Sequence, residues 1–354
     1  MTAPIPAWAA PSAKAPLVPH PITRREPGPR DVQIEILYCG VCHSDIHQAR
    51  NEWADSMPSV FPMVPGHEIV GRVTKVGADV SKFAVGDVAG VGCFVDSCHE
   101  CNPCRRHLEQ FCLKGAAFTY NSTEMDRKTP TYGGYSTQIV VTERYALKVP
   151  PGLELAAAAP LLCAGITTYS PLRHWKCAPG QSVGVVGLGG LGHMAVKLAA
   201  SMGAEVTMLS TSRAKEADAR RLGAHAFELT SDVQKLRKLA GRFDLLIDTI
   251  SAEHDLNTYL GLLKPEGAMV CLGAPPKPAP LAMMSLIYGS KTLAGSMIGG
   301  IAETQEMLDY CASKKITADV EMIPIEKINE AYERMLTSDV RYRFVIDIAS
   351  LKGS

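Results

Sequence analysis

The sequence predicts a protein of two parts: a β-rich N-terminal domain and an α/β domain built on a doubly wound parallel sheet. Its 354 residues correspond to about two domains of ordinary size. Residues 1–150 contain short strand-like runs broken by Pro and Gly. After the break at Pro150-Pro151-Gly152, apolar strands alternate with helical stretches, which is typical of a parallel sheet covered by helices.

The individual elements follow these two patterns along the chain. Val32, Ile34 and Ile36 alternate with more polar residues, which predicts a strand over residues 31–39. The run 183–186 has no polar side chain, as in a parallel strand buried on both faces. We expect further strands at 69–76, 85–91, 136–141, 205–209, 243–248, 268–272 and 343–348, and helices at 153–162, 214–222, 303–313 and 325–337, with one more ending at 202.

Composition excludes several classes of protein. Lys plus Arg and Asp plus Glu both number 36, so the chain has no net charge with which to attract nucleic acid or an anionic membrane. Neither a secretory leader nor an apolar run long enough to span a bilayer is visible. We therefore expect a soluble, cytoplasmic protein with no nucleic-acid or membrane partner.

A glycine-rich motif, Gly187-Leu188-Gly189-Gly190-Leu191-Gly192, follows the strand at 183–186 and opens a helix. This is the context that a dinucleotide-binding fingerprint requires. Gly187 would allow the tight turn, Gly189 would let the backbone approach the pyrophosphate, and Gly192 would let helix and strand pack closely. The alternative is a glycine turn without a ligand.

The end of the next strand indicates which dinucleotide binds. An NAD site usually has Asp or Glu there, to accept a hydrogen bond from the ribose 2′-hydroxyl. This chain has no carboxylate at that point and instead offers hydroxyls and cations that suit a 2′-phosphate. We therefore predict NADP(H); the alternative is that Arg213 and Lys215 are ordinary solvated charges. The residues are Ser210, Thr211, Ser212, Arg213 and Lys215.

Five of the eleven cysteines fall between residues 93 and 112. Cys98, Cys101, Cys104 and Cys112 have the close spacing of a tetrahedral structural zinc site. An iron–sulfur cluster is the alternative, because four thiolates also suit iron.

A second set of metal-ligating residue types is dispersed. Cys42, His67 and Cys163 would provide two thiolates and one imidazole, leaving a fourth position open as in a catalytic zinc site. The spacing of these three residues along the chain does not by itself predict that they form one site, and each residue alone is more often part of the core.

Several motifs taken together indicate that these three residues belong to one site. They are Gly40-Val41-Cys42-His43-Ser44-Asp45, Gly66-His67-Glu68-x2-Gly71-x5-Gly77-x2-Val80, the four-cysteine segment, Tyr132-Gly133-Gly134-Tyr135-Ser136, the glycine motif, and residues 339–347. With these motifs the chain, from about residue 30 onward, resembles the zinc-dependent medium-chain alcohol dehydrogenases. Residues 339–347 are similar to their cinnamyl alcohol dehydrogenase and aldehyde reductase branch in particular.

The resemblance implies an architecture. A GroES-like catalytic domain would comprise residues 1–156, with a structural zinc lobe at 93–115, and would be completed by a return segment at 297–354. A Rossmann domain would occupy 157–296, and the substrate would lie in the cleft. The family usually forms homodimers through the edge of the Rossmann sheet, for which the segment 289–300 is the candidate.

The resemblance also implies roles for single residues. Cys42, His67 and Cys163 would bind a catalytic Zn²⁺, so that each chain would hold two zinc ions. Glu68 would approach the metal and help exchange its fourth ligand; the alternative is a supporting partner or a structural salt bridge. Ser44 would pass a proton through the cofactor ribose to His47, because histidine is the residue type suited to exchanging a proton with water; the alternative for His47 is a surface histidine.

Two cofactor contacts and a pocket complete the set. Thr167 would pack against the nicotinamide, and Arg343 would reach the pyrophosphate, with Arg341 as the alternative. The substrate pocket would be apolar; its candidate residues are Trp53, Tyr120 and Ile298.

The implied activity is hydride transfer between NADP(H) and aromatic or aliphatic aldehydes and primary alcohols, with zinc as the Lewis acid. The alternatives are a polyol dehydrogenase of the same family and a non-catalytic protein that senses zinc or redox state. A zinc-free quinone reductase would lack the set formed by Cys42, His67 and Cys163.

Overall fold

The computed structural model describes residues 4–275 and 277–352 and contains two compact units. The first unit is Met1–Cys163 together with Gly299–Ser354, and the second is Ala164–Ile298. In the part of the chain that is described, no single helix is long and apolar enough to cross a membrane. Among the described residues one pair, Leu155–Leu162 and Ala164–His174, passes that test together but is bent between the two segments, and both segments consist mostly of buried residues.

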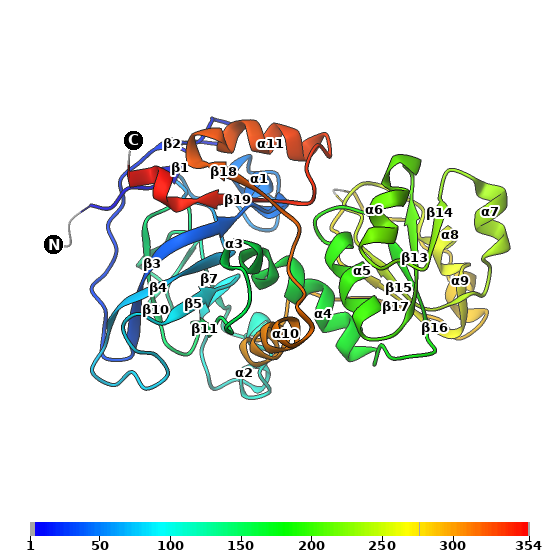
Figure 1. Cartoon of the computed structure of the whole chain (residues 1–354), viewed down its shortest axis with the longest axis horizontal. Helices are drawn as coiled ribbons and strands as arrows, with labels where there is room; N and C mark the ends of the chain where they lie inside the picture. The colour runs from blue at the N-terminus through cyan, green and yellow to red at the C-terminus, as the bar shows by residue number, and fades with distance from the viewer. Residues whose placement is uncertain (1–3, 276, 353–354) are drawn as a thin grey trace. The chain divides into compact units, whose positions relative to one another are not determined.

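The first unit is built around a seven-stranded sheet (Figure 1). Its strand order is β11-β5-β4-β3-β19-β18, and β10 pairs with β3. Neighbours are antiparallel except β18 and β19, so the C-terminal segment completes the N-terminal sheet. The bounds are β3 (Asp31–Gly40), β4 (Ile69–Val76), β5 (Val88–Val91), β10 (Gln138–Thr142), β11 (Leu147–Lys148), β18 (Val320–Pro324) and β19 (Arg343–Asp347).

Strand β3 shows why this sheet forms. Val32, Ile34 and Ile36 are buried on one face, as their alternation with Gln33 and Glu35 predicts. Short pieces surround the sheet: β1 (Trp8–Ala9), β2 (Val18–Pro19), α1 (His43–Ala49), β6 (Phe94–Asp96), α2 (Asn102–Arg105), η1 (Glu109–Phe111), β7 (Ala117–Phe118), β8 (Ser122–Thr123), β9 (Pro130–Thr131), α3 (Leu155–Ala158), η2 (Ala159–Leu162), α10 (Ile301–Lys314), η4 (Ile325–Lys327), α11 (Ile328–Leu336) and η5 (Ile348–Lys352).

The second unit is a six-stranded, wholly parallel sheet in the order β14-β13-β12-β15-β16-β17. In chain order this is 3-2-1-4-5-6, the arrangement of a dinucleotide-binding Rossmann domain. The bounds are α4 (Ala164–His174), β12 (Ser182–Val186), α5 (Gly192–Ser201), β13 (Glu205–Ser210), η3 (Arg213–Lys215), α6 (Glu216–Arg221), β14 (Ala226–Leu229), α7 (Val233–Lys238), β15 (Phe243–Asp248), α8 (Leu256–Leu260), β16 (Leu263–Cys271), α9 (Met284–Ile287) and β17 (Thr292–Gly295).

The core of the second unit explains its central strands. Val186 on β12, Leu209 on β13 and Met269 on β16 are buried in one apolar cluster with Phe243 and Leu246 of β15. A Cβ at Gly184 would lie 2.4 Å from Leu246 Cδ2, so the Leu246 side chain occupies the space that a larger residue there would need. The predicted fold class is confirmed, and the elements differ from the prediction in detail. Strands β14 and β17 were not predicted, and the expected helix 153–162 ends as a 3₁₀ turn, η2.

Candidate metal centres and cofactor site

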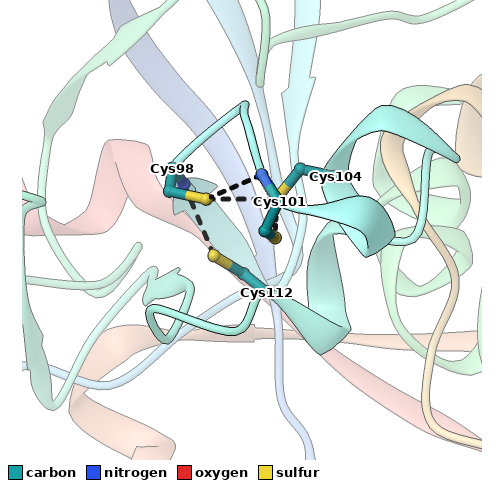
Figure 2. Close-up of side chains that lie close together, drawn as sticks. All are labelled: Cys98, Cys101, Cys104 and Cys112. Atoms are coloured by element: carbon teal, nitrogen blue, oxygen red, sulfur yellow. Dashed lines mark hydrogen bonds between the residues drawn. The ribbon is translucent and has the colours of Figure 1, made fainter.

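Four thiols converge in the loop region around α2 and η1 (Figure 2). The sulfur atoms of Cys98, Cys101, Cys104 and Cys112 all lie within 4.8 Å of one another. The separation is 3.9 Å between Cys98 and Cys104 and 3.4 Å between Cys101 and Cys104. Tetrahedral Zn–S bonds of about 2.3 Å place sulfurs about 3.8 Å apart, so the donor set fits zinc.

Backbone amides donate hydrogen bonds to several of these sulfurs. The Cys101 N–H donates to Cys98 Sγ at 3.4 Å, and the Cys98 N–H donates to Cys112 Sγ at 3.5 Å. A hydrogen bond from the Cys104 N–H, with another from Leu113, lowers the pKa of Cys101 to about 6. Because metals bind the thiolate form, Cys101 is prepared for a metal, whereas burial raises the pKa of Cys104 to about 12.

The second set is also brought together by the fold, although its members come from distant parts of the chain. Cys42 precedes α1, His67 precedes β4, and Cys163 follows η2; all three are buried. Their ligand atoms and one carboxylate oxygen of Glu68 lie within 4.8 Å of one another. Cys42 Sγ and Cys163 Sγ are 3.9 Å apart, again the separation expected across a tetrahedral zinc ion.

A buried acid, Asp45, holds this set in place. Its Oδ1 accepts hydrogen bonds from His67 Nδ1 at 3.2 Å and from the Gly66 N–H at 3.1 Å. Its Oδ2 accepts from the Cys42 N–H at 2.8 Å and from the Tyr135 hydroxyl at 3.4 Å. Because Nδ1 of His67 is engaged by the carboxylate, Nε2 remains for a metal.

Glu68 and Arg343 form an ion pair in which both side chains are buried. Arg343 is the first residue of β19, so the C-terminal segment places a guanidinium group in the site. Burial raises the pKa of Glu68 to about 7, although the Arg343 charge opposes this shift. The other carboxylate oxygen, Oε2, is buried and has no hydrogen-bond partner among the described residues. A metal beside it would satisfy that oxygen, which agrees with the donor set.

The glycine turn of the second unit lies between β12 and α5. Gly187 has φ +90°, which favours glycine, and a Cβ on Gly192 would lie 1.9 Å from the Gly187 carbonyl oxygen. A Cβ on Gly189 would meet nothing within 4 Å. The turn is therefore tight at both ends and leaves space above Gly189, next to the N-terminus of a ten-residue helix.

Near this turn lie the residues that follow β13. Lys215 Nζ donates to the Leu188 carbonyl at 2.8 Å, which places an ammonium group directly over the turn. Ser210 is buried and its Oγ accepts from the Ser212 N–H at 3.3 Å. The Arg213 side chain is 64% exposed and lies 3.4 Å from Glu216.

The comparisons with known proteins agree with this geometry. Residues 28–151 match the alcohol dehydrogenase GroES-like domain, and residues 190–313 match the zinc-binding dehydrogenase domain. An NADP-dependent alcohol dehydrogenase C of Mycolicibacterium smegmatis is 57% identical, covering 98% of this chain and 99% of its own length. The aldehyde reductase YahK of Escherichia coli is 56% identical, covering 96% and 97%. A cinnamyl alcohol dehydrogenase structure from Sorghum bicolor has a TM-score of 0.95 and 44% identity, covering 98% of each chain.

The chain belongs to the zinc-binding alcohol dehydrogenases. The resemblance stated from its motifs is confirmed, and so is the GroES-like plus Rossmann architecture. The two sets whose ligand atoms converge, the four thiols and the group that includes Cys42, His67 and Cys163, offer the sulfur and nitrogen donors that zinc takes in proteins.

Other expected residues of this alcohol dehydrogenase lie as follows. Ser44, on the first turn of α1, has its Oγ 3.7 Å from Cys42 Sγ. His47 Nδ1 donates to Glu52 Oε2 at 2.5 Å, and the His47 ring lies 4.9 Å from that of Trp53. Tyr120 is buried and stacks on His67, with 5.6 Å between ring centroids.

In the second unit, Thr167 is buried on α4 and Ile298 is half-buried at the end of the unit. Of the two arginines considered for the pyrophosphate, Arg343 is the one that lies against Glu68, whereas Arg341 is exposed. A pyrophosphate contact by either remains a prediction. The ion pair with Glu68 is the structural alternative that the sequence left open.

Sequence reasoning missed the role of Asp45. The residue stands in the motif that identified the family, but nothing in its spacing connects it to His67, 22 residues away. Its position at the third residue of α1, where a carboxylate accepts from the N–H before the helix, is the only local signal.

Proposed function

We propose that this chain is a zinc-dependent oxidoreductase that transfers a hydride between NADP(H) and aldehydes or primary alcohols. The observation that carries the proposal is the buried set formed by Cys42, His67 and Cys163, beside the paired Glu68. Relatives that share more than half of their residues over nearly the whole chain, an NADP-dependent alcohol dehydrogenase and an aldehyde reductase, support it.

Zinc supplies a Lewis acid for the substrate oxygen, and NADPH supplies the hydride. The chain's own residues hold the metal ligands in place and orient them. Cys42, His67 and Cys163 provide three ligands, Asp45 fixes the imidazole through Nδ1, and the buried setting keeps water from the thiols. The hydrogen bond with Cys163 holds the pKa of Cys42 well below its ordinary value, so the set carries thiolate charge before any metal binds.

A proton must reach the substrate oxygen when an aldehyde is reduced. Ser44 Oγ, next to Cys42, is placed to donate it, and His47 lies three residues later on the same face of α1. His47 is partly exposed and its Nδ1 donates to Glu52, which fixes the ring and leaves Nε2 for exchange with water. We assign Ser44 as the donor and His47 as the group that restores its proton.

The residues after β13 suit a 2′-phosphate. Ser210 and Ser212 supply hydroxyls, Arg213 is an exposed guanidinium, and Lys215 lies over the turn. With no carboxylate at the strand end to bind a free 2′-hydroxyl, we propose a preference for NADPH over NADH. Trp53 beside His47 and Tyr120 over His67 give this side of the site an aromatic surface, which favours aromatic and medium-chain aldehydes.

The deciding experiment measures initial rates of NADPH and NADH oxidation with cinnamaldehyde, benzaldehyde and hexanal, on protein with measured zinc content. The expected result is aldehyde-dependent oxidation that favours NADPH. Preference for NADH would overturn the cofactor assignment but not the enzyme class. Turnover only in the reverse direction, with mannitol or sorbitol, would favour a polyol dehydrogenase. No turnover by fully metallated protein would favour a binding protein.

We also propose a homodimer that forms through the edge of the Rossmann sheet. Strand β17 is the last strand of that sheet and has one free edge. Before it, α9 and the following turn expose a row of large apolar side chains. These are Met283, Met284, Ile287 and Tyr288.

We assign residues 1–156 with 297–354 to the catalytic domain and 157–296 to the cofactor domain.

A further inference from the structure

His254 lies in the loop of residues 249–255, between β15 and α8, and both of its ring nitrogens face an acceptor. Nε2 is 2.9 Å from Asp248 Oδ2, and Nδ1 is 2.8 Å from the Ala252 carbonyl oxygen. The His254 side chain is 12% exposed and that of Asp248 is 2% exposed. None of the functions assigned above uses this pair.

The two contacts determine how many protons the pair holds. A carbonyl oxygen only accepts, so Nδ1 carries a proton. Nε2 and Oδ2 lie at hydrogen-bond distance, so one more proton lies between them, on either the imidazole or the carboxyl group. If that proton were lost, two lone pairs would face each other at 2.9 Å in a nearly dry setting, which would push the loop apart.

The same loop forms one wall of the glycine turn. Thr249 Oγ1 donates to the carbonyls of Val186 at 2.8 Å and Gly187 at 3.0 Å. A Cβ on Gly187 would lie 3.1 Å from Ile250 Cγ1, so Ile250 contacts the turn directly. Asp248 also fixes this residue, since its Oδ1 accepts from the Ile250 N–H at 3.1 Å. The His254–Asp248 pair therefore closes the loop whose start supports the turn.

The groups that face the pair are few among the described residues. Cys271, on β16, lies beside Asp248, and burial raises the pKa of its thiol to about 12. The ring of Tyr259, on α8, meets the imidazole edge-on with 5.8 Å between centroids. Asp255 is the next acid along the loop, and Glu253 pairs outward with Lys277 at 2.8 Å. Burial also raises the pKa of Asp248, which favours retention of the shared proton.

We propose that His254, with Asp248, is a positioning residue for dinucleotide binding. The proton they share locks residues 249–254 against the glycine turn and so holds that turn in its binding conformation. This inference rests on the proposed function, because it takes the turn to bind NADPH.

The test is the dissociation constant for NADPH, followed by nucleotide fluorescence in zinc-loaded protein. In His254→Asn a single amide cannot bridge Asp248 and the Ala252 carbonyl as the ring does, and we expect a dissociation constant about tenfold higher. The turnover number at saturating NADPH and the KM for aldehyde should not change. His174→Asn, the same substitution at an exposed histidine of the second unit, is the matched control.

A pH series separates positioning from general loosening. The dissociation constant of the wild type and of His174→Asn should depend on pH, because loss of the shared proton would set two lone pairs against each other, and this dependence should be weaker in His254→Asn. Should His254→Asn not fold, Asp248→Asn tests the same pair. Its amide oxygen accepts from the Ile250 N–H and its NH₂ donates to Nε2 of the neutral ring, so the contact no longer needs a shared proton and the pH dependence of the dissociation constant should be lost.

The outcomes are distinguishable. Equal affinity in His254→Asn and the wild type, or an unchanged pH profile, would overturn the positioning role while leaving the proposed function intact. A wild type that binds only NADH would overturn the cofactor assignment, and the same comparison would then be made with NADH. A wild type that binds neither nucleotide would overturn both.

Discussion

At the scale of single residues, the charge and proton state of a few side chains decide what the first unit can do. Asp45 has no exposed surface and accepts several hydrogen bonds, two of which come from the Cys42 backbone N–H and the His67 ring. One carboxylate thereby fixes the direction of an imidazole and the backbone that carries a thiol. The ligand set is held by packing and hydrogen bonds before any metal arrives.

Replacing Ser44 with Ala tests the proton donor. Loss of a positioned general acid should lower the turnover number for aldehyde reduction by about 100-fold or more. Zinc content, measured by atomic absorption, should remain at the wild-type value, because Ser44 only borders Cys42. Ser81→Ala, at an exposed serine of the same unit, should leave both values unchanged. Normal turnover in Ser44→Ala would rule out the relay.

Removal of zinc should reveal unequal thiols in the four-cysteine lobe. At pH 8 a thiol of pKa about 6, such as Cys101, is mostly thiolate, whereas Cys104, whose pKa burial raises to about 12, stays protonated. Iodoacetamide should therefore label Cys101 first once a chelator has removed the metal, and the preference should fade as the pH falls below 6.

Peptide mass spectrometry measures this labelling. Cys177 serves as the internal control, because burial raises its pKa to about 11 and no metal set includes it. Its labelling should be slow with or without the chelator. Equal labelling of Cys101 and Cys104 in metal-free protein would contradict the prediction.

At the scale of elements, two glycines of the turn between β12 and α5, Gly189 and Gly192, should respond differently to replacement by Ala. Gly192→Ala would place a methyl group 1.9 Å from the Gly187 carbonyl, so the helix must move and the melting temperature should fall, at a cost of about 1–3 kcal/mol. Gly189→Ala meets nothing within 4 Å, so its melting temperature should match the wild type. The new methyl group would nevertheless occupy the space proposed for the pyrophosphate, and NADPH should bind more weakly.

Thermal unfolding and NADPH titration of both variants check this pair. We expect Gly192→Ala to lower the melting temperature and Gly189→Ala to weaken NADPH binding. If Gly189→Ala bound NADPH as the wild type does, the phosphates would not lie over this turn.

The strands of the parallel sheet differ in how well the sequence predicts them. Strands β12 and β15 lie inside the parallel sheet and contain the apolar runs 183–186 and 245–247, so their pattern is plain. Strands β14 and β17 are its two edges, and both are only four residues long and partly exposed. An edge strand needs less apolar surface, so residues 226–229 and 292–295 carry too little signal to be predicted.

The candidate site divides in a similar way. Motifs that are local in sequence, such as the four cysteines and the glycine turn, could be predicted from residue type and spacing. The contact between Glu68 and Arg343 joins residues 275 positions apart, through a C-terminal strand that pairs with β3. No local pattern records such a contact, because it depends on the return of the chain to the first sheet.

At the scale of the whole molecule, the unpaired surface of the Rossmann unit is the feature that most needs a partner. Tyr288 is 81% exposed and Ile287 is 66% exposed, next to the free edge of β17. A second copy placed about a twofold axis would bring the same apolar row against itself and would pair edge with edge. The described residues of this chain leave that row exposed to solvent.

Ile287→Glu tests this assembly, because a buried carboxylate at a self-complementary interface would face its own copy. Light scattering after gel filtration should give twice the chain mass of 38.0 kDa for the wild type and a single chain for the variant. Val85→Glu is the matched control: Val85 is 63% exposed but lies in the first unit, and its variant should keep the wild-type mass. The variant's NADPH affinity should stay within about twofold, since α9 contributes no residue to the glycine turn. An Ile287→Glu protein that kept the double mass would place the interface elsewhere, and a wild type of single mass would leave β17 as a free edge.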